Sequence, residues 1–99
     1  MDLLIDTAKI SIKDYEEFEK YLLENIEQGD VVQGTGGIRK TRLKSSSKGK
    51  RGGFRVCYID IPEKEILFLL VMYGKNEKED LSQKEKKILK SLVEVLKNR

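Results

Sequence analysis

Histidine is absent from this sequence of 99 residues, and cysteine and proline each occur once, as Cys57 and Pro62. Without histidine and with one cysteine, a single chain cannot build a disulfide framework or a zinc site of Cys and His ligands. The same shortage removes parts that Ser-His-Asp acyl transfer and metal-assisted hydrolysis require. We therefore expect no metal and no cofactor, and a reducing compartment fits the cysteine content best.

Long apolar runs are also missing. The longest, Ile66 to Tyr73, is far too short to span a bilayer, and the first residues lack the basic start and long apolar stretch of a signal peptide. These features predict a cytoplasmic protein without a membrane segment. With 38% hydrophobic residues, the chain has enough apolar material for one core, so we expect a single domain over residues 1–99.

Acidic residues are absent between Asp30 and Asp60, and this interval carries the main functional signal. The segment from Gly34 to Tyr58 contributes a formal charge of +8 to a chain whose total is +3, so the remainder is net negative. A concentrated positive field suits a polyanion, of which nucleic acid is the commonest for a small soluble protein. The alternative is a solvated basic loop without a ligand, and we expect a flexible basic loop at about residues 44–53.

Hydrophobic periodicity predicts two amphipathic helices. The first covers residues 13–27, with Asp14 as a candidate N-cap and an apolar face that is made by Tyr15, Phe18, Leu22, Leu23 and Ile26. The second begins after a capping box of Ser82 and Glu85, and its apolar stripe consists of Ile88, Leu89, Leu92, Val93 and Leu96. Residues 2–12 are typical of either a short edge strand or a helix lead-in.

Three strands are predicted between the helices, at residues 38–43, 54–61 and 65–73. The first is polar on both faces, as expected of an edge strand or the lining of a groove, whereas the third is apolar throughout and should be central. Gly34 to Gly37 predict a tight turn, and Pro62 predicts another. The fold class is therefore α+β, with a small antiparallel sheet of three to four strands that is flanked by an N-terminal and a C-terminal helix.

The residues that remain for chemistry are Lys, Arg and Tyr. Such a set can cleave RNA, because the 2′-hydroxyl of RNA attacks the adjacent phosphate and the protein needs only to move protons and neutralise charge. Arg55 is the strongest candidate, since a charge in an otherwise apolar strand is costly unless it lines a groove or meets a partner such as Asp60. Lys40 lies between Arg39 and Arg42, and Tyr73 lies near Lys75. We interpret Cys57 as a core residue.

Three motifs, GTGGIRKTR, GKRGGFRVCY and YGKNEKEDLS, occur in this order and resemble the RelE/ParE toxin superfamily, in particular its HigB-type branch. The resemblance covers roughly residues 14–97. It implies a RelE-like fold and a toxin of a type II toxin–antitoxin pair: a ribosome-dependent mRNA endoribonuclease that needs no metal and is held inactive by a cognate antitoxin. The chain departs from the RelE pattern at Asn76, where an arginine is common, and after Leu81, where the C-terminal tyrosine of RelE has no counterpart.

The resemblance and the charge pattern together give the candidate residues. The predicted catalytic set is Arg55, Lys40, Arg42, Lys75 and Tyr73, and the predicted RNA-binding set is Arg39, Lys44, Lys48, Lys50, Arg51 and Asn76. The implied partners are the antitoxin, mRNA and the ribosomal A site, and a toxin–antitoxin hetero-oligomer would bind operator DNA through the antitoxin. Two alternatives stay open at this point: a ParE-like poison of DNA gyrase without nuclease activity, and a non-catalytic RNA-binding domain.

Overall fold

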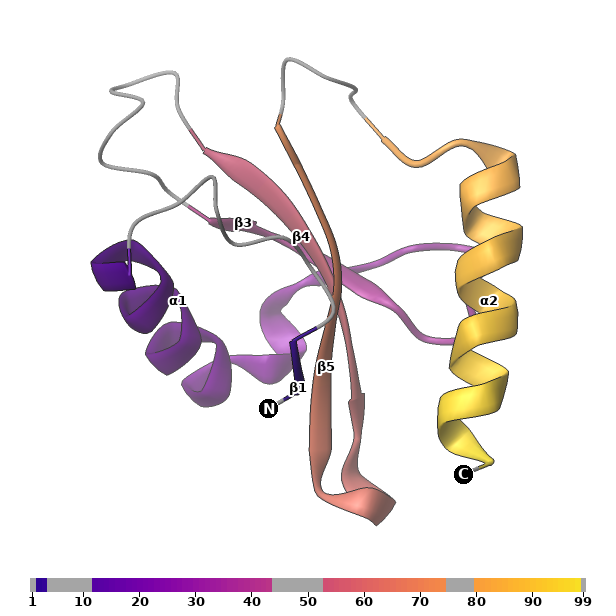
Figure 1. Cartoon of the computed structure of the whole chain (residues 1–99), viewed down its shortest axis with the longest axis horizontal. Coiled ribbons are helices and arrows are strands. Elements are labelled where there is room, and N and C mark those ends of the chain that lie inside the picture. The colour runs from indigo at the N-terminus through magenta and orange to yellow at the C-terminus, as the bar shows by residue number, and fades with distance from the viewer. Residues whose placement is uncertain (1, 4–11, 44–52, 75–79, 99) are drawn as a thin grey trace.

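The computed structural model describes residues 2–3, 12–43, 53–74 and 80–98, and its elements form one sheet between two helices (Figure 1). The strands are β1 (Asp2–Leu3), β2 (Asp30–Val31), β3 (Arg39–Leu43), β4 (Phe54–Ile61) and β5 (Ile66–Gly74). The α-helices are α1 (Ile12–Glu24) and α2 (Gln83–Lys97), and the short 3₁₀ helices are η1 (Ile26–Gln28) and η3 (Pro62–Lys64). None of the helices in these ranges is long and apolar enough to cross a lipid bilayer.

The sheet has the order β1-β5-β4-β3-β2. The pairs β2–β3, β3–β4 and β4–β5 are antiparallel, whereas β1 pairs with β5 in parallel. The predicted α+β class with an antiparallel sheet is confirmed, and the edge-strand interpretation of the N-terminus is confirmed for Asp2–Leu3. The two-residue strand β2 was not predicted, because two residues carry no periodicity.

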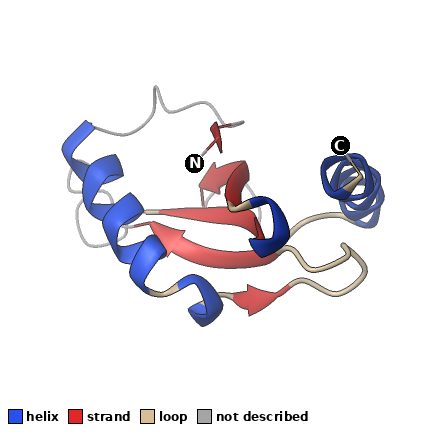
Figure 2. Ribbon diagram, turned by 90° about the horizontal axis from the view of Figure 1, so that it is seen from below, coloured by secondary structure: helices blue, strands red, loops and turns tan. Residues whose placement is uncertain are grey.

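The two helices cover opposite faces of the sheet (Figures 1 and 2), and each face has its own apolar cluster. Phe18 and Leu22 of α1 pack with Leu43, Phe54, Val56, Tyr58, Leu67 and Leu69. Leu89, Val93 and Leu96 of α2 pack in the second cluster, whose other buried members are Val32, Ile38, Cys57, Ile59, Ile61, Phe68, Leu70, Tyr73 and Leu81. Cys57 is thus a core residue, as interpreted from the sequence.

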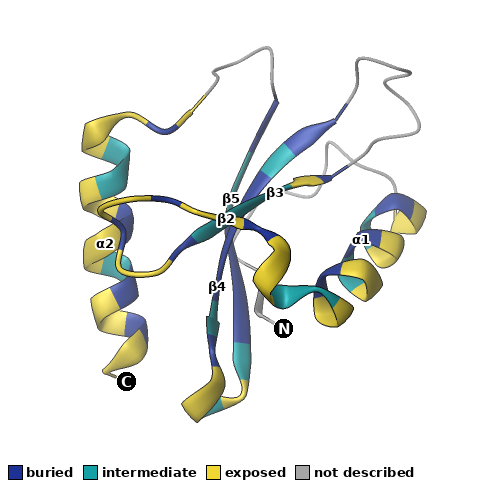
Figure 3. Cartoon of the chain, turned by 180° about the vertical axis from the view of Figure 1, so that it is seen from behind, coloured by how far each residue is buried: buried dark blue, intermediate teal, exposed yellow. Residues whose placement is uncertain are grey.

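The apolar helix faces are narrower than the sequence patterns indicated. Leu23 of α1 is 52% exposed and Ile88 of α2 is 59% exposed, although both were assigned to core-facing stripes. Figure 3 shows exposed residues along the outward side of each helix. A flat sheet covers only one side of a helix, so apolar residues at the margin of the stripe stay in solvent.

The ends of α1 differ from the prediction. The helix begins at Ile12, so Asp14 lies in its first turn, where a carboxylate complements the helix dipole, and the N-cap assignment for Asp14 is wrong. At the other end α1 stops at Glu24, and η1 follows it up to Gln28. The capping box of α2 is confirmed: the Ser82 hydroxyl accepts from Glu85 N–H at 3.1 Å, and Glu85 Oε1 accepts from Ser82 N–H at 2.8 Å.

A β-bulge in β5 determines which face receives its last residues. Cys57 pairs with Val71 while Tyr58 pairs with Leu69, so Leu70 is an extra residue in the ladder. Leu70 and Val71 consequently both pack in the α2 cluster, and the alternation beyond them is shifted by one. The bulge therefore places Tyr73 on the α2 face and Met72 on the α1 face.

Candidate nucleic-acid interface

Three candidate residues lie side by side across the three longest strands. Arg42 of β3 pairs in register with Arg55 of β4, and Arg55 pairs with Tyr73 of β5. Directly paired residues project from the same face of a sheet, and Tyr73 belongs to the α2 cluster, so the row lies on the α2 face. Lys40, which pairs with Cys57, lies two residues further along the same face. The sheet thus brings together four of the predicted catalytic residues by register.

Arg55 lies in the middle strand and is partly buried. Asp60, its candidate ion-pair partner, projects from the other face, because the two residues are separated by an odd number of positions along one strand. Within the described ranges no carboxylate forms an ion pair with Arg55. The guanidinium charge therefore lies at the sheet surface and is not neutralised by a carboxylate of the described residues. A site that binds an anion requires such an unneutralised charge.

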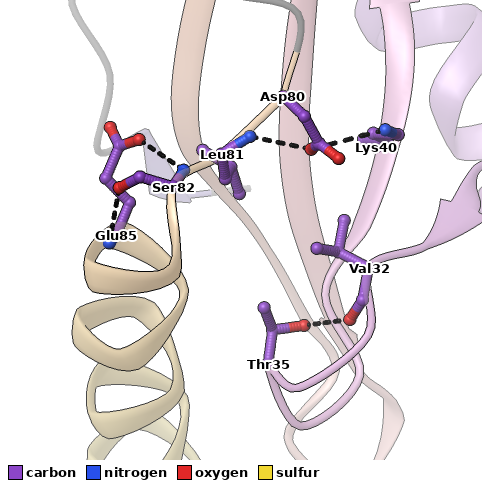
Figure 4. Close-up of polar contacts among 7 residues, drawn as sticks. All are labelled: Val32, Thr35, Lys40, Asp80, Leu81, Ser82 and Glu85. Atoms are coloured by element: carbon purple, nitrogen blue, oxygen red, sulfur yellow. Dashed lines mark hydrogen bonds and ion pairs between the residues drawn. The ribbon is translucent and has the colours of Figure 1, made fainter.

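Lys40 contacts a carboxylate from outside the basic segment. Its Nζ lies 3.5 Å from Asp80 Oδ1, and the same oxygen accepts the Leu81 N–H at 2.7 Å (Figure 4). The pKa of the Asp80 carboxyl is lowered, first by this backbone hydrogen bond and then by the nearby charges of Lys40 and Lys86. The start of α2 thereby brings a negative charge to the cationic face.

Tyr73 is inside the molecule rather than on its surface. Only 2% of the residue is exposed, and its hydroxyl oxygen is buried. Burial raises the pKa of Tyr73 to about 12, with Cys57 and Asp80 adding to the effect and Arg55 opposing it. The phenol is therefore neutral near pH 7, and it lies next to Arg55 as an uncharged neighbour.

Arg42 is exposed near the end of β3. It lines an open pocket of about 400 Å³ whose other lining residues are Asp14, Glu17, Phe18, Tyr21 and Thr41. Register groups Arg42 with Arg55, and the residue also borders a pocket next to α1 that contains Asp14 and Glu17. Of the four residues in the group, Arg42 is the one that also lines this pocket beside α1.

Arg39 projects from the α1 face, away from the other cations, because it pairs with Tyr58. Its Nη1 donates to the carbonyls of Glu27 at 3.2 Å and Gly29 at 2.7 Å. Tyr58 holds the same segment by donating to Ile26 O at 2.5 Å and accepting from Gly29 N–H at 3.2 Å. The guanidinium of Arg39 thus fixes the backbone between α1 and β2, and the structure does not bring it to the predicted RNA site.

Glycine is needed at the centre of that segment. A Cβ at Gly29 would lie 2.5 Å from Tyr58 Oη and 2.9 Å from the Lys40 carbonyl oxygen, closer than real Cβ atoms approach. The missing side chain lets the backbone pass close beside β3 and Tyr58 as it enters β2. The remaining predicted residues, which are Lys44, Lys48, Lys50, Arg51, Lys75 and Asn76, lie outside the described residues, as does most of the predicted basic loop.

Comparison with known proteins assigns the family. The family model described as RelE toxin of the RelE/RelB toxin–antitoxin system matches residues 7–99. The chain belongs to the RelE toxin family. A solved structure of a mutant of the Escherichia coli toxin RelE in the free state aligns with 78% of this chain and 85% of that chain, at 24% identity and a TM-score of 0.52. At this identity the likeness to the RelE structure shows the shared fold.

Membership of the RelE family makes this protein the toxin of a toxin–antitoxin pair and implies a cognate antitoxin as partner. The more specific HigB-type assignment stays a prediction. In this RelE-family toxin the sequence did not single out Asp80, because its contact with Lys40 joins two segments that only the fold brings together. One signal was available: Asp80 lies two residues before the N-cap Ser82, so it had to lie where the chain returns from β5 to α2.

Proposed function

We propose that this RelE-family toxin is a ribosome-dependent mRNA endoribonuclease that its cognate antitoxin inhibits. The family assignment and the cationic face of the sheet support this proposal. The ribosomal A site as the place of action and operator DNA as a target of the toxin–antitoxin complex come from the resemblance of the motifs. The cytoplasm as the compartment comes from the cysteine content and the short apolar runs of the sequence.

The observation that carries the proposal is the position of Arg55. It is partly buried near the start of β4, the middle strand of the sheet, it has register neighbours on both sides, and it has no salt bridge within the described ranges. Arginine remains charged at every physiological pH, and its planar guanidinium matches a phosphate with two parallel hydrogen bonds. Arg55 is therefore suited to the charge that develops on a phosphate under attack.

The proposed reaction is transfer of the phosphate to its neighbouring hydroxyl. The 2′-oxygen loses its proton and bonds to phosphorus, the bond to the 5′-oxygen breaks, and that oxygen takes up a proton. Arg55 and Lys40 would stabilise the extra negative charge on the phosphoryl oxygens. Tyr73 is neutral and buried, so its proposed part is to hold Arg55 in place, and a direct proton transfer from it requires opening of the face. Lys75 remains a candidate for proton transfer.

The test is cleavage of mRNA in a cell-free translation system. Arg55→Ala should lower the cleavage rate by about 100-fold or more, the usual cost of removing one donor that stabilises transition-state charge. Lys90→Ala, which removes an exposed cation of α2, is the matched control and should keep full activity.

Two outcomes would contradict the proposal. Full cleavage by Arg55→Ala would remove this residue from the site. Inhibition of DNA supercoiling by the wild-type toxin, together with intact mRNA in translation, would instead identify a gyrase poison.

A further inference from the structure

The contact between Lys40 and Asp80 joins two distant parts of the chain at the proposed site. Lys40 is 28% exposed and Asp80 is 50% exposed, so solvent and solutes reach both charges. The separation of 3.5 Å is longer than the roughly 2.7–2.9 Å of a strong charge-assisted hydrogen bond. The contact is therefore weak enough for another anion to replace it.

Asp80 is nevertheless well fixed in space. Its carboxylate accepts the Leu81 N–H, the Leu81 side chain is buried in the α2 cluster, and Ser82 caps the helix. The carboxylate is thus held next to Lys40 by the rigid start of α2 rather than by the ion pair alone (Figure 4). A fixed anion beside a lysine competes with any anion in solution for that lysine.

We infer that Asp80 is a further functional residue of this site: its carboxylate takes the place of an RNA phosphate at Lys40 and is displaced from Lys40 when RNA binds. This inference rests on the proposed function for the identity of the ligand. Asp80 acts through Lys40, so it is a positioning residue. It keeps the ammonium on the sheet face in the free toxin, and it weakens binding of RNA that engages Lys40 alone.

The test uses Asp80→Asn, because asparagine can still accept the Leu81 N–H but carries no charge. The probe is a single-stranded RNA whose 2′-hydroxyls are all replaced by 2′-methoxy groups, so that it binds without being cut. Asp80→Asn should bind this probe about three-fold more tightly than wild type, as expected for loss of one exposed competing charge. Thermal denaturation should show only a small loss of stability, since the exposed ion pair contributes little and the Ser82 cap is retained.

The matched controls separate local competition from a general change in charge. Glu94→Gln removes an exposed carboxylate about three turns along α2, and its gain in affinity should be clearly smaller. In a Lys40→Met background the gain from Asp80→Asn should disappear, because the competition requires the ammonium.

Equal gains in Asp80→Asn and Glu94→Gln, or a gain that persists in Lys40→Met, would overturn the inference. Weaker probe binding by Asp80→Asn would overturn it as well. The outcome is separable from the proposed function. If the toxin cleaves mRNA but Asp80→Asn shows no gain that depends on Lys40, the endoribonuclease proposal stands and the inference about Asp80 fails. If the gain is found but no mRNA is cleaved, Asp80 lies beside an RNA-binding site that has no nuclease activity.

Discussion

At the scale of single residues, the cations of this toxin divide into two kinds. Arg39 donates hydrogen bonds to the carbonyls of Glu27 and Gly29 and so stabilises the backbone. Arg55 and Lys40 instead lie on the α2 face of the sheet, where Lys40 contacts Asp80. Alternation along the strand places Arg39 on the opposite face of β3 from Lys40, and this much can be read from the sequence. The carbonyls that bind the Arg39 guanidinium depend on the close approach of the η1 segment to β3, which no local pattern shows.

Tyr73 gives a prediction at this scale. Its raised pKa means that, between about pH 10 and about pH 12, the unfolded chain ionises this phenol while the folded protein keeps it neutral. Stability from this group is therefore complete below about pH 10 and is lost as the pH rises toward 12. Tyr73→Phe should reduce this alkaline loss, measured as the midpoint of thermal denaturation across that window.

The control for Tyr73 is Tyr21→Phe, because Tyr21 is 46% exposed. This variant should retain the wild-type loss of stability at alkaline pH. Equal alkaline behaviour of Tyr73→Phe and the wild type would show that the phenol of Tyr73 is not held neutral by burial.

At the scale of elements, the sequence predicted best what short-range chemistry decides. The capping box of Ser82 and Glu85 and the turn at Pro62 depend on neighbours a few residues away, and both are present. The bulge at Leu70 could not be predicted from the sequence. In a continuous apolar run the hydrophobic pattern is the same with or without an extra residue, so it gives no sign of a bulge. Tyr73 could therefore be named as a candidate from the sequence, but its face could not.

The cap of α2 gives the prediction for this scale. Ser82→Ala removes the acceptor for Glu85 N–H and should cost about 1 kcal/mol of the free energy of unfolding. Urea denaturation measures this cost. Ser91→Ala, in the middle of α2, is the matched control and should change stability little, as its hydroxyl only donates to a carbonyl of its own helix. Equal costs for the two variants would exclude a special contribution from the cap.

At the scale of the whole molecule, the two helices give the two faces of the sheet surroundings of opposite charge. By formal charge α1 carries an excess of acidic residues and α2 an excess of lysines, so the face with Lys40 and Arg55 is also the more basic side. This sidedness follows from the sequence once the helices are assigned to faces, and that assignment came from the structure. The basic side is where a polyanion meets the least repulsion.

Salt dependence tests this sidedness. Binding of single-stranded RNA should weaken linearly on logarithmic axes as salt rises, and Lys40→Ala should reduce the slope by about 0.7, the value for one phosphate contact. Lys13→Ala on α1 should leave the slope unchanged, since this exposed lysine lies with the acidic helix. The same reduction in both variants would show that RNA does not distinguish the two sides.

The parallel pairing of β1 with β5 has a consequence for biosynthesis. Asp2 and Leu3 lie far along the chain from their strand partners, Phe68 and Leu69. During translation β1 can pair only after β5 has been made, because the contact joins residues of high sequence separation. A nascent chain that ends before β5 therefore lacks this edge of the sheet, and the five-stranded order is complete only after β5 has been synthesised.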